Sequence, residues 1–202
     1  MITVEQFREK AKCSAVRELL EDHVLGDECS HVTSDNCELI GETLRVRFGI
    51  QSDDPLKIQI VGSAKLGFSI SEKHLADGSI LPRYRAFSPV SDIDTVVICP
   101  MIFDAIWNDL STYAGQSVSR LPWNSGALGD YLVHGWLRPD LFPKVTSLRK
   151  CQDWWNVFSE LSLNKDFNRH SVRGAIFHSL EHLKRYQLRS ITECVRVEVI
   201  GQ

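Results

Sequence analysis

Two short apolar runs with polar residues at their ends constrain the fold of this chain more than any other feature. Residues 56–61 alternate in polarity and are rich in β-branched side chains, so they predict a strand that ends at Gly62 and Ser63. Residues 93–98 predict a second strand, which starts among acidic residues and is followed by a proline. The predicted order is therefore a strand, a Gly-Ser turn and a second strand with an acidic start.

Most of the remaining pattern is helical. Apolar residues recur at helical spacing in residues 3–24, 35–48, 101–114, 151–163 and from about 171 onward. Residues 131–137 predict a short strand, and residues 195–200 alternate like a strand although they also continue the last helical pattern. We therefore expect an α/β fold, a small mixed sheet flanked by helices with a helical C-terminal part. Residues 1–137 are expected to form the core and residues 138–202 to pack on it as one compact unit.

Composition excludes membrane and disulfide-rich classes of protein. The 202 residues contain no apolar run of about 20 residues, which a membrane span needs. The first residues have neither the basic nor the apolar part of a secretion signal. Six cysteines follow no regular spacing, so we interpret them as reduced thiols. We expect a cytoplasmic protein without a membrane partner.

The acidic start of the second strand has the chemistry of a magnesium site. Residues two apart on a strand point to the same face, so Asp92 and Asp94 are expected to present both carboxylates together. Carboxylate oxygens are ligands that Mg²⁺ prefers, and two such ions stabilise phosphoryl transfer in many enzymes. Taken alone, an Asp-x-Asp pair is also typical of a solvated strand end.

The Gly-Ser turn after the first strand is suited to phosphate. Gly62 lets the backbone approach a phosphate closely, and the helical turn predicted over residues 64–69 adds free N–H groups. The Ser63 hydroxyl can donate to a terminal phosphate oxygen, and Lys65 is a further candidate cation. Because Gly-Ser is common in ordinary turns, its meaning depends on its place before the acidic strand.

This order of motifs resembles the DNA polymerase β superfamily of nucleotidyltransferases, whose signature is Gly-Ser, a variable spacer and Asp-x-Asp. The resemblance covers residues from about 35 to 99, and Ser91-Asp92-Ile93-Asp94 is particularly similar to minimal bacterial members. It implies a nucleotidyltransferase-like sheet in which Gly62 and Ser63 contact the β- and γ-phosphates. It also implies that Asp92 and Asp94 hold two Mg²⁺ ions. Single-domain bacterial members often act with a partner protein, as in toxin–antitoxin or defence pairs.

The chain departs from that signature in its spacer. Asp92 follows Ser63 by 29 positions, where many minimal members have about a dozen residues. Residues 70–90 therefore look like an insertion beside the site. Their positive charges either meet a phosphate or an acceptor or belong to a solvated loop; they are Lys73, His74, Arg83 and Arg85.

The second departure concerns a third carboxylate, which the family usually has on a later strand. Asp140, just after residues 131–137, is one candidate, and Glu198 in the alternating tail is another. Both are also typical of surface acids. If neither lies near Asp92 and Asp94, catalysis is expected to be weak or absent.

Three functions remain open at this point. The first is an Mg²⁺-dependent transfer of a nucleoside monophosphate from a nucleoside triphosphate to a hydroxyl on a protein, an RNA end or a small molecule. The second is a catalytically weak or inactive module of the same fold that senses a nucleotide or binds a protein partner. The third is nucleic-acid binding through residues 138–202, which hold 11 Lys and Arg against 7 Asp and Glu.

Overall fold

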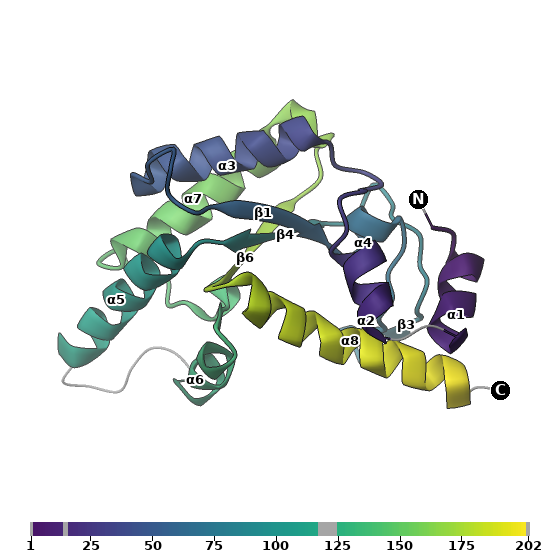
Figure 1. Cartoon of the computed structure of the whole chain (residues 1–202). Coiled ribbons are helices and arrows are strands. Elements are labelled where there is room, and N and C mark those ends of the chain that lie inside the picture. The colour runs from purple at the N-terminus through teal and green to yellow at the C-terminus, as the bar shows by residue number, and fades with distance from the viewer. Residues whose placement is uncertain (1, 14–15, 117–124, 201–202) are drawn as a thin grey trace.

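The computed structural model describes residues 2–13, 16–116 and 125–200 and has a mixed α/β architecture (Figure 1). Its main sheet has the strand order β1-β4-β6-β5. The strands are β1 (Lys57–Val61), β4 (Ile93–Ile98), β6 (Val172–Phe177) and β5 (Trp136–Leu137). The α/β class and the strands predicted over residues 56–61 and 93–98 are therefore confirmed.

The sheet combines neighbouring and distant parts of the chain. β1 and β4 are antiparallel, β4 and β6 are parallel, and β6 and β5 are antiparallel. β6 comes from the last third of the chain, yet it lies between β4 and β5. The C-terminal part thus contributes a central strand to the sheet as well as helices.

Three helices cover one face of the sheet. These are α3 (Ser34–Phe48), α5 (Pro100–Gln116) and α7 (Arg149–Leu163) (Figure 1). α3 begins after Thr33, whose side chain caps the Asn36 N–H, and ends at Gly49 in the left-handed conformation. The apolar side chains that fill this layer include Ile40, Leu44, Ile60, Ile93, Val97, Ile102, Ile106, Trp154 and Ile176.

Close contact between β6 and α7 depends on a glycine. A Cβ atom on Gly174 would lie 2.1 Å from the Phe158 ring, which is closer than real Cβ contacts. The missing side chain therefore makes room for an aromatic ring directly on the sheet.

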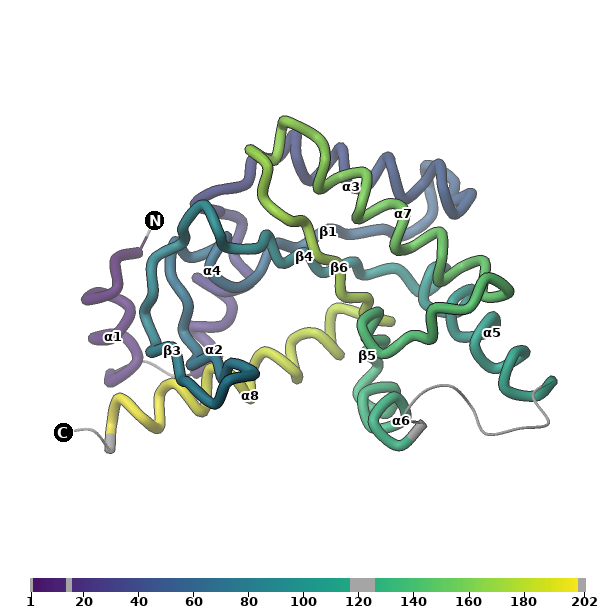
Figure 2. The backbone as a smooth tube through the Cα atoms, turned by 180° about the vertical axis from the view of Figure 1, so that it is seen from behind, coloured from purple at the N-terminus to yellow at the C-terminus, as the bar shows by residue number. Residues whose placement is uncertain are grey.

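The opposite face of the sheet carries α8 (Leu180–Ile200), which runs away from the sheet toward the N-terminal helices (Figures 1 and 2). A small apolar cluster joins the two, with Val96 and Phe177 from the sheet and Leu183 from the helix. Because α8 covers only part of this face, polar residues at the β1 and β4 ends stay open to a cavity.

The distal half of α8 packs against the first helices of the chain. α1 (Val4–Cys13), α2 (Val16–Leu19) and a π-helical turn (Leu20–Val24) form a second core with it. Phe7, Leu19, Ile191 and Cys194 are buried there. Both ends of the chain therefore lie on the same side of the molecule (Figures 1 and 2).

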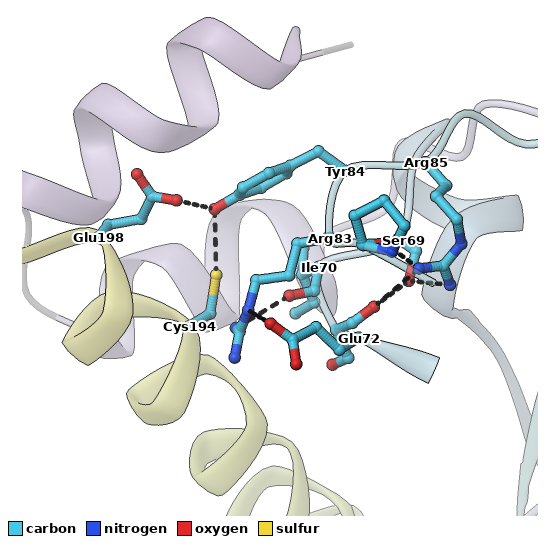
Figure 3. Close-up of polar contacts among 10 residues, drawn as sticks. Ser69, Ile70, Glu72, Arg83, Tyr84, Arg85, Cys194 and Glu198 are labelled. Atoms are coloured by element: carbon cyan, nitrogen blue, oxygen red, sulfur yellow. Dashed lines mark hydrogen bonds and ion pairs between the residues drawn. The ribbon is translucent and has the colours of Figure 1, made fainter. Parts of the chain in front are cut away.

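Residues 70–90 form a hairpin, β2 (Lys73–His74) with β3 (Ile80–Leu81), followed by turns. Tyr84, which has a positive φ of 61°, reaches α8 and donates its hydroxyl to Glu198 at 2.7 Å (Figure 3). Arg83 donates to the carbonyl oxygen of Ile70, the residue just before the hairpin. The hairpin is therefore held both by α8, through Tyr84, and by the segment that precedes it. The insertion is therefore anchored to the fold.

Several predicted boundaries are wrong. The helix expected from residue 171 starts only at Leu180, because residues 172–177 pair with two strands as β6. The alternating tail at 195–200 is helical throughout, since it continues α8 along the N-terminal core. The strand expected over 131–137 is the end of α6 (Ser125–Val133) followed by the two residues of β5.

Short elements complete the described chain. They are α4 (Gly62–Leu66) and the 3₁₀ turns Pro139–Leu141 and Lys165–Phe167. All six cysteines are free, as predicted. None of the described helices combines the length and the apolar character required to cross a bilayer.

Candidate functional site

The Gly-Ser turn and the acidic strand meet at one point of the sheet. Antiparallel pairing places Val61, the last residue of β1, opposite Asp94 of β4. The chain then turns at Gly62, which has a φ of 68° that favours glycine. A Cβ atom at this position would lie 3.1 Å from Oδ2 of Asp94. The two predicted motifs are therefore in contact although 28 residues lie between Ser63 and Asp92.

The residues after Gly62 divide between the site and the core. Ser63 lines the cavity beside Asp94, and its hydroxyl makes no hydrogen bond to any described residue. Lys65 is buried instead, and its Nζ donates to the carbonyl oxygen of Gly26. Burial lowers the pKa of the Lys65 ammonium. Lys65, whose direction the sequence left open, therefore points away from the cavity and is not a cation of the site.

A network of turns fixes the start of β4. The Ser88 N–H donates to Oγ of Ser91, and the Ser91 N–H donates back to the Ser88 carbonyl oxygen. Nδ1 of His170 donates to the carbonyl oxygen of Ser91 at 2.9 Å. The Ile93 N–H then donates to Ser171, which brings β6 beside the acidic residues. These contacts fix the position of Asp92 and Asp94 at the N-terminal end of β4, an inner strand of the sheet.

Both aspartates face the same cavity, as predicted from their spacing. Burial and the negative charge of Asp92 raise the pKa of Asp94 to about 6, while Arg173 and Lys73 act in the opposite direction. Asp94 is open to the cavity, but protein surrounds the carboxylate on several sides and weakens its solvation. A cation bound nearby would stabilise the ionised form of Asp94 and lower its pKa.

Arg173 could be read from the sequence as either a pocket residue or part of a solvated helix face, and the structure places it on a strand beside the aspartates. The parallel pairing of β4 and β6 places it beside Asp94, and its Nε lies 3.0 Å from Oδ2 of Asp92. The Arg173 side chain is 67% exposed and the Asp92 side chain 25% exposed. Helical spacing predicts a helix over this run, so the sequence does not place Arg173 next to the aspartates. The available signal was the β-branched and apolar character of residues 172–177.

The site lies in a cavity of about 1040 Å³ between the sheet, the insertion and α8. Its lining includes Gly62, Ser63, Asp92 and Asp94 together with Lys73 and Arg173. Aromatic and polar groups of the wall come from Trp136, Tyr186, Gln187 and Ser190. The volume lies just above the usual range of small-molecule sites, which is about 300–1000 Å³.

Neither candidate for a third carboxylate joins the aspartate pair. Glu198 accepts hydrogen bonds from Tyr84 and Arg8 in the N-terminal core and does not line the cavity. Asp140 lines the cavity wall but pairs with Arg138. The described residues contain no group of three His, Cys, Asp or Glu side chains that would hold a metal ion. Glu72 also lines the cavity but lies 3.6 Å from Arg83, so Asp92 and Asp94 are the carboxylates that lie together here.

The cations of the insertion have separate roles. Lys73 lines the cavity, and no hydrogen bond joins its ammonium to a described residue. Arg85 also lines the cavity, but its guanidinium donates to Ser69 and to the Pro82 carbonyl oxygen. Arg83 donates to backbone and lies beside Glu72, and His74 is exposed away from the lining. Lys73 is thus the insertion residue best placed to meet a ligand.

No protein-family model, curated protein or solved structure matches this chain. The chemistry of the site therefore rests on its own geometry. Hard carboxylate oxygens, a glycine turn, a serine hydroxyl and several cationic side chains, Lys73 and Arg173 among them, line one cavity. This set of groups is suited to a polyphosphate accompanied by a divalent cation.

Proposed function

We propose that this protein is an Mg²⁺-dependent nucleotidyltransferase that moves a nucleoside monophosphate from a nucleoside triphosphate to a hydroxyl acceptor. The observation that carries the proposal is the contact between the Gly62 turn and Asp94. It brings a turn compatible with phosphate and a pair of carboxylates to the same cavity. The acceptor is a hydroxyl of a partner protein, an RNA end or a small molecule.

Each group has a defined task in this proposal. Gly62 lets the backbone turn without a side chain beside the phosphates, and the Ser63 hydroxyl donates to a terminal phosphate oxygen. Asp92 and Asp94 would hold Mg²⁺, which when bound neutralises charge on the triphosphate and the leaving group. Lys73 and Arg173 supply further positive charge at the cavity.

The transfer forms one phosphorus–oxygen bond and breaks another. The acceptor hydroxyl oxygen attacks the α-phosphorus, and the bond between the α-phosphorus and the oxygen that bridges to the β-phosphate breaks. Pyrophosphate leaves with that oxygen and its electron pair. The proton of the acceptor hydroxyl passes to solvent, which reaches the reacting groups through the cavity.

The test uses the purified chain with each nucleoside triphosphate, Mg²⁺ and a set of acceptors: bulk RNA, lysate proteins and small alcohols. Mass spectrometry identifies any acceptor whose mass grows by a nucleoside monophosphate, and released pyrophosphate is measured in parallel. We expect transfer by the wild type and its loss in Asp92→Asn and Asp94→Asn. Asp104→Asn, an exposed change on α5, is the matched control. Unchanged transfer in both site variants would refute the proposal.

A second candidate function is nucleotide binding without transfer. The ion pair between Arg173 and Asp92 favours this function. So does the finding that no third acidic side chain joins Asp92 and Asp94 among the described residues. In that case calorimetry would detect Mg²⁺-dependent binding of a nucleoside triphosphate. No acceptor would gain mass and no pyrophosphate would form, which separates this function from the first.

A further inference from the structure

We infer that this site takes a single divalent cation, the one that accompanies the triphosphate, and that Arg173 occupies the place of a second cation. The inference rests on the proposed function, because it concerns how the same site binds its nucleotide. It assigns to Arg173 the role of a phosphate-binding and positioning residue.

The first step of the argument concerns the oxygens of Asp92. A carboxylate that bridges two metal ions gives one oxygen to each ion, and the ions lie about 3.5–4 Å apart. Oδ2 of Asp92 already lies 3.0 Å from Nε of Arg173. Only Oδ1 is then open to a metal, since no other hydrogen bond or ion pair of Asp92 is found among the described residues. Asp92 can therefore serve one cation but does not bridge two.

The second step concerns the strand beside the acidic pair. β6 runs parallel to β4, and Arg173 is the register partner of Asp94. Neighbouring strands lie about 4.8 Å apart, so a side chain at this position on the same face reaches the ligands of any ion bound there. A second metal ion beside Asp94 would need a further carboxylate ligand on the neighbouring strand. At that position the chain has the guanidinium of Arg173 instead. Because the Arg173 guanidinium already pairs with one of the two carboxylates, the pair has less negative charge to offer a second divalent cation.

The third step concerns the free part of Arg173. Its Nε lies beside Asp92, and its Nη groups donate no hydrogen bond to any described residue. The side chain is 67% exposed and lines the cavity. A guanidinium can bind a carboxylate through one edge and a phosphate through another because its donors form a rigid planar fork. Arg173 is thus arranged to link Asp92 to a bound phosphate.

The experiment counts metal ions by electron paramagnetic resonance. Mn²⁺ replaces Mg²⁺, and the signal of free Mn²⁺ is titrated against the chain with saturating α,β-methylene analogues of the four common nucleoside triphosphates. These analogues cannot transfer their nucleotide, so the readout is independent of activity. We expect a single Mn²⁺ per bound analogue in the wild type.

Three variants test the role of Arg173. Arg173→Asp adds a carboxylate beside Asp94, and we expect it to bind a second Mn²⁺. Arg173→Gln should keep one Mn²⁺ and bind the analogue about tenfold or more weakly, since a charge-assisted hydrogen bond is lost. Arg169→Gln removes the same charge from an exposed position just before β6 and should change neither value.

The outcomes separate this inference from the proposed function. Two Mn²⁺ per bound analogue in the wild type would overturn the inference while leaving nucleotide transfer possible. Unchanged analogue affinity in Arg173→Gln would overturn the role of Arg173. Failure of every analogue to bind the wild type would overturn both. If circular dichroism shows that Arg173→Asp does not fold, two measurements still test the inference. They are the number of Mn²⁺ ions bound by the wild type and the affinity of Arg173→Gln for the analogue.

Discussion

Gly62 approaches Asp94 so closely that a Cβ atom on the glycine would lie 3.1 Å from Oδ2 of the aspartate. The contact follows from the antiparallel pairing of β1 with β4, which sets Val61 opposite Asp94. A turn with a positive φ and a carboxylate of raised pKa thus share one corner of a cavity. Both the stability of the fold and the proposed binding of a triphosphate depend on this corner.

Replacing Gly62 by alanine should disturb both properties. The φ of 68° costs a residue with a Cβ about 1–2 kcal/mol, and the new methyl group would press on Asp94. We expect a loss of this size in the free energy of unfolding, measured in urea, and weaker binding of Mg²⁺ and nucleotide. Gly49→Ala is the matched control, because Gly49 has a φ of 70° but open space around its Cβ position. It should lose stability alone; equal nucleotide binding by both variants would contradict the prediction.

Replacing Asp94 by asparagine should raise stability at neutral pH while abolishing nucleotide transfer. The folded-state pKa of about 6 lies above the usual value of 3.8, so the ionised form is disfavoured by folding. The penalty is fully present above about pH 6, declines as pH falls and is absent below the unfolded pKa. Because the carboxylate is open to solvent, we expect a gain of no more than about 1 kcal/mol at pH 7.5.

Thermal unfolding of Asp94→Asn and the wild type across pH 4 to 8 checks this prediction. The gain should be present at pH 7.5 and vanish near pH 4. Asp92→Asn serves as comparison, because it removes one negative charge but also breaks the ion pair with Arg173. A gain that is independent of pH would show that desolvation of the Asp94 charge is not its cause.

The contact between the insertion and α8 should contribute to stability through Tyr84. Its hydroxyl donates to Glu198 at 2.7 Å and lies 3.4 Å from Sγ of Cys194 (Figure 3). Burial alone would raise the pKa of Glu198, but the hydrogen bonds from Tyr84 and Arg8 outweigh it and lower that pKa. Tyr84→Phe leaves a buried carboxylate with fewer donors, and we expect a loss of about 1–2 kcal/mol in urea unfolding.

Arg8→Gln provides the comparison for that variant. The Arg8 side chain is 52% exposed, so water can replace much of its contact with Glu198. We expect a smaller loss than for Tyr84→Phe. The reverse order would show that the ion pair, and not the tyrosine hydroxyl, holds the insertion on α8.

A side chain at Gly174 should separate β6 from α7. The Cβ of alanine would lie 2.1 Å from the Phe158 ring, so the ring or the strand must move. Overpacking of this kind costs about 1–3 kcal/mol, and Gly174→Ala should lie at the upper end. Phe158→Leu makes room for the methyl group and should recover part of the loss. A double-mutant cycle without coupling would contradict this explanation.

Local signals were sufficient for the parts of the site that lie on β1 and β4. Alternating residues predicted β1 and an apolar run ended by a proline predicted β4, while the two-residue spacing predicted that Asp92 and Asp94 face the same side. The same reasoning failed at residues 172–177, because helical spacing from Ile176 onward extended the expected helix backward. Hydrogen bonding of β6 to strands on both sides outweighs that local preference.

By itself, the sequence determined where the Gly-Ser turn and the acidic start of the second strand occur, and which side chains they contain. These depend on side-chain period and turn chemistry, which are properties of neighbouring residues. Only the tertiary structure decided that Arg173 lies beside Asp94, that Lys65 is directed away from the cavity and that Glu198 is held by Tyr84. Strand order and long-range contacts depend on the total free energy of packing the sheet between its helices, which no local pattern records.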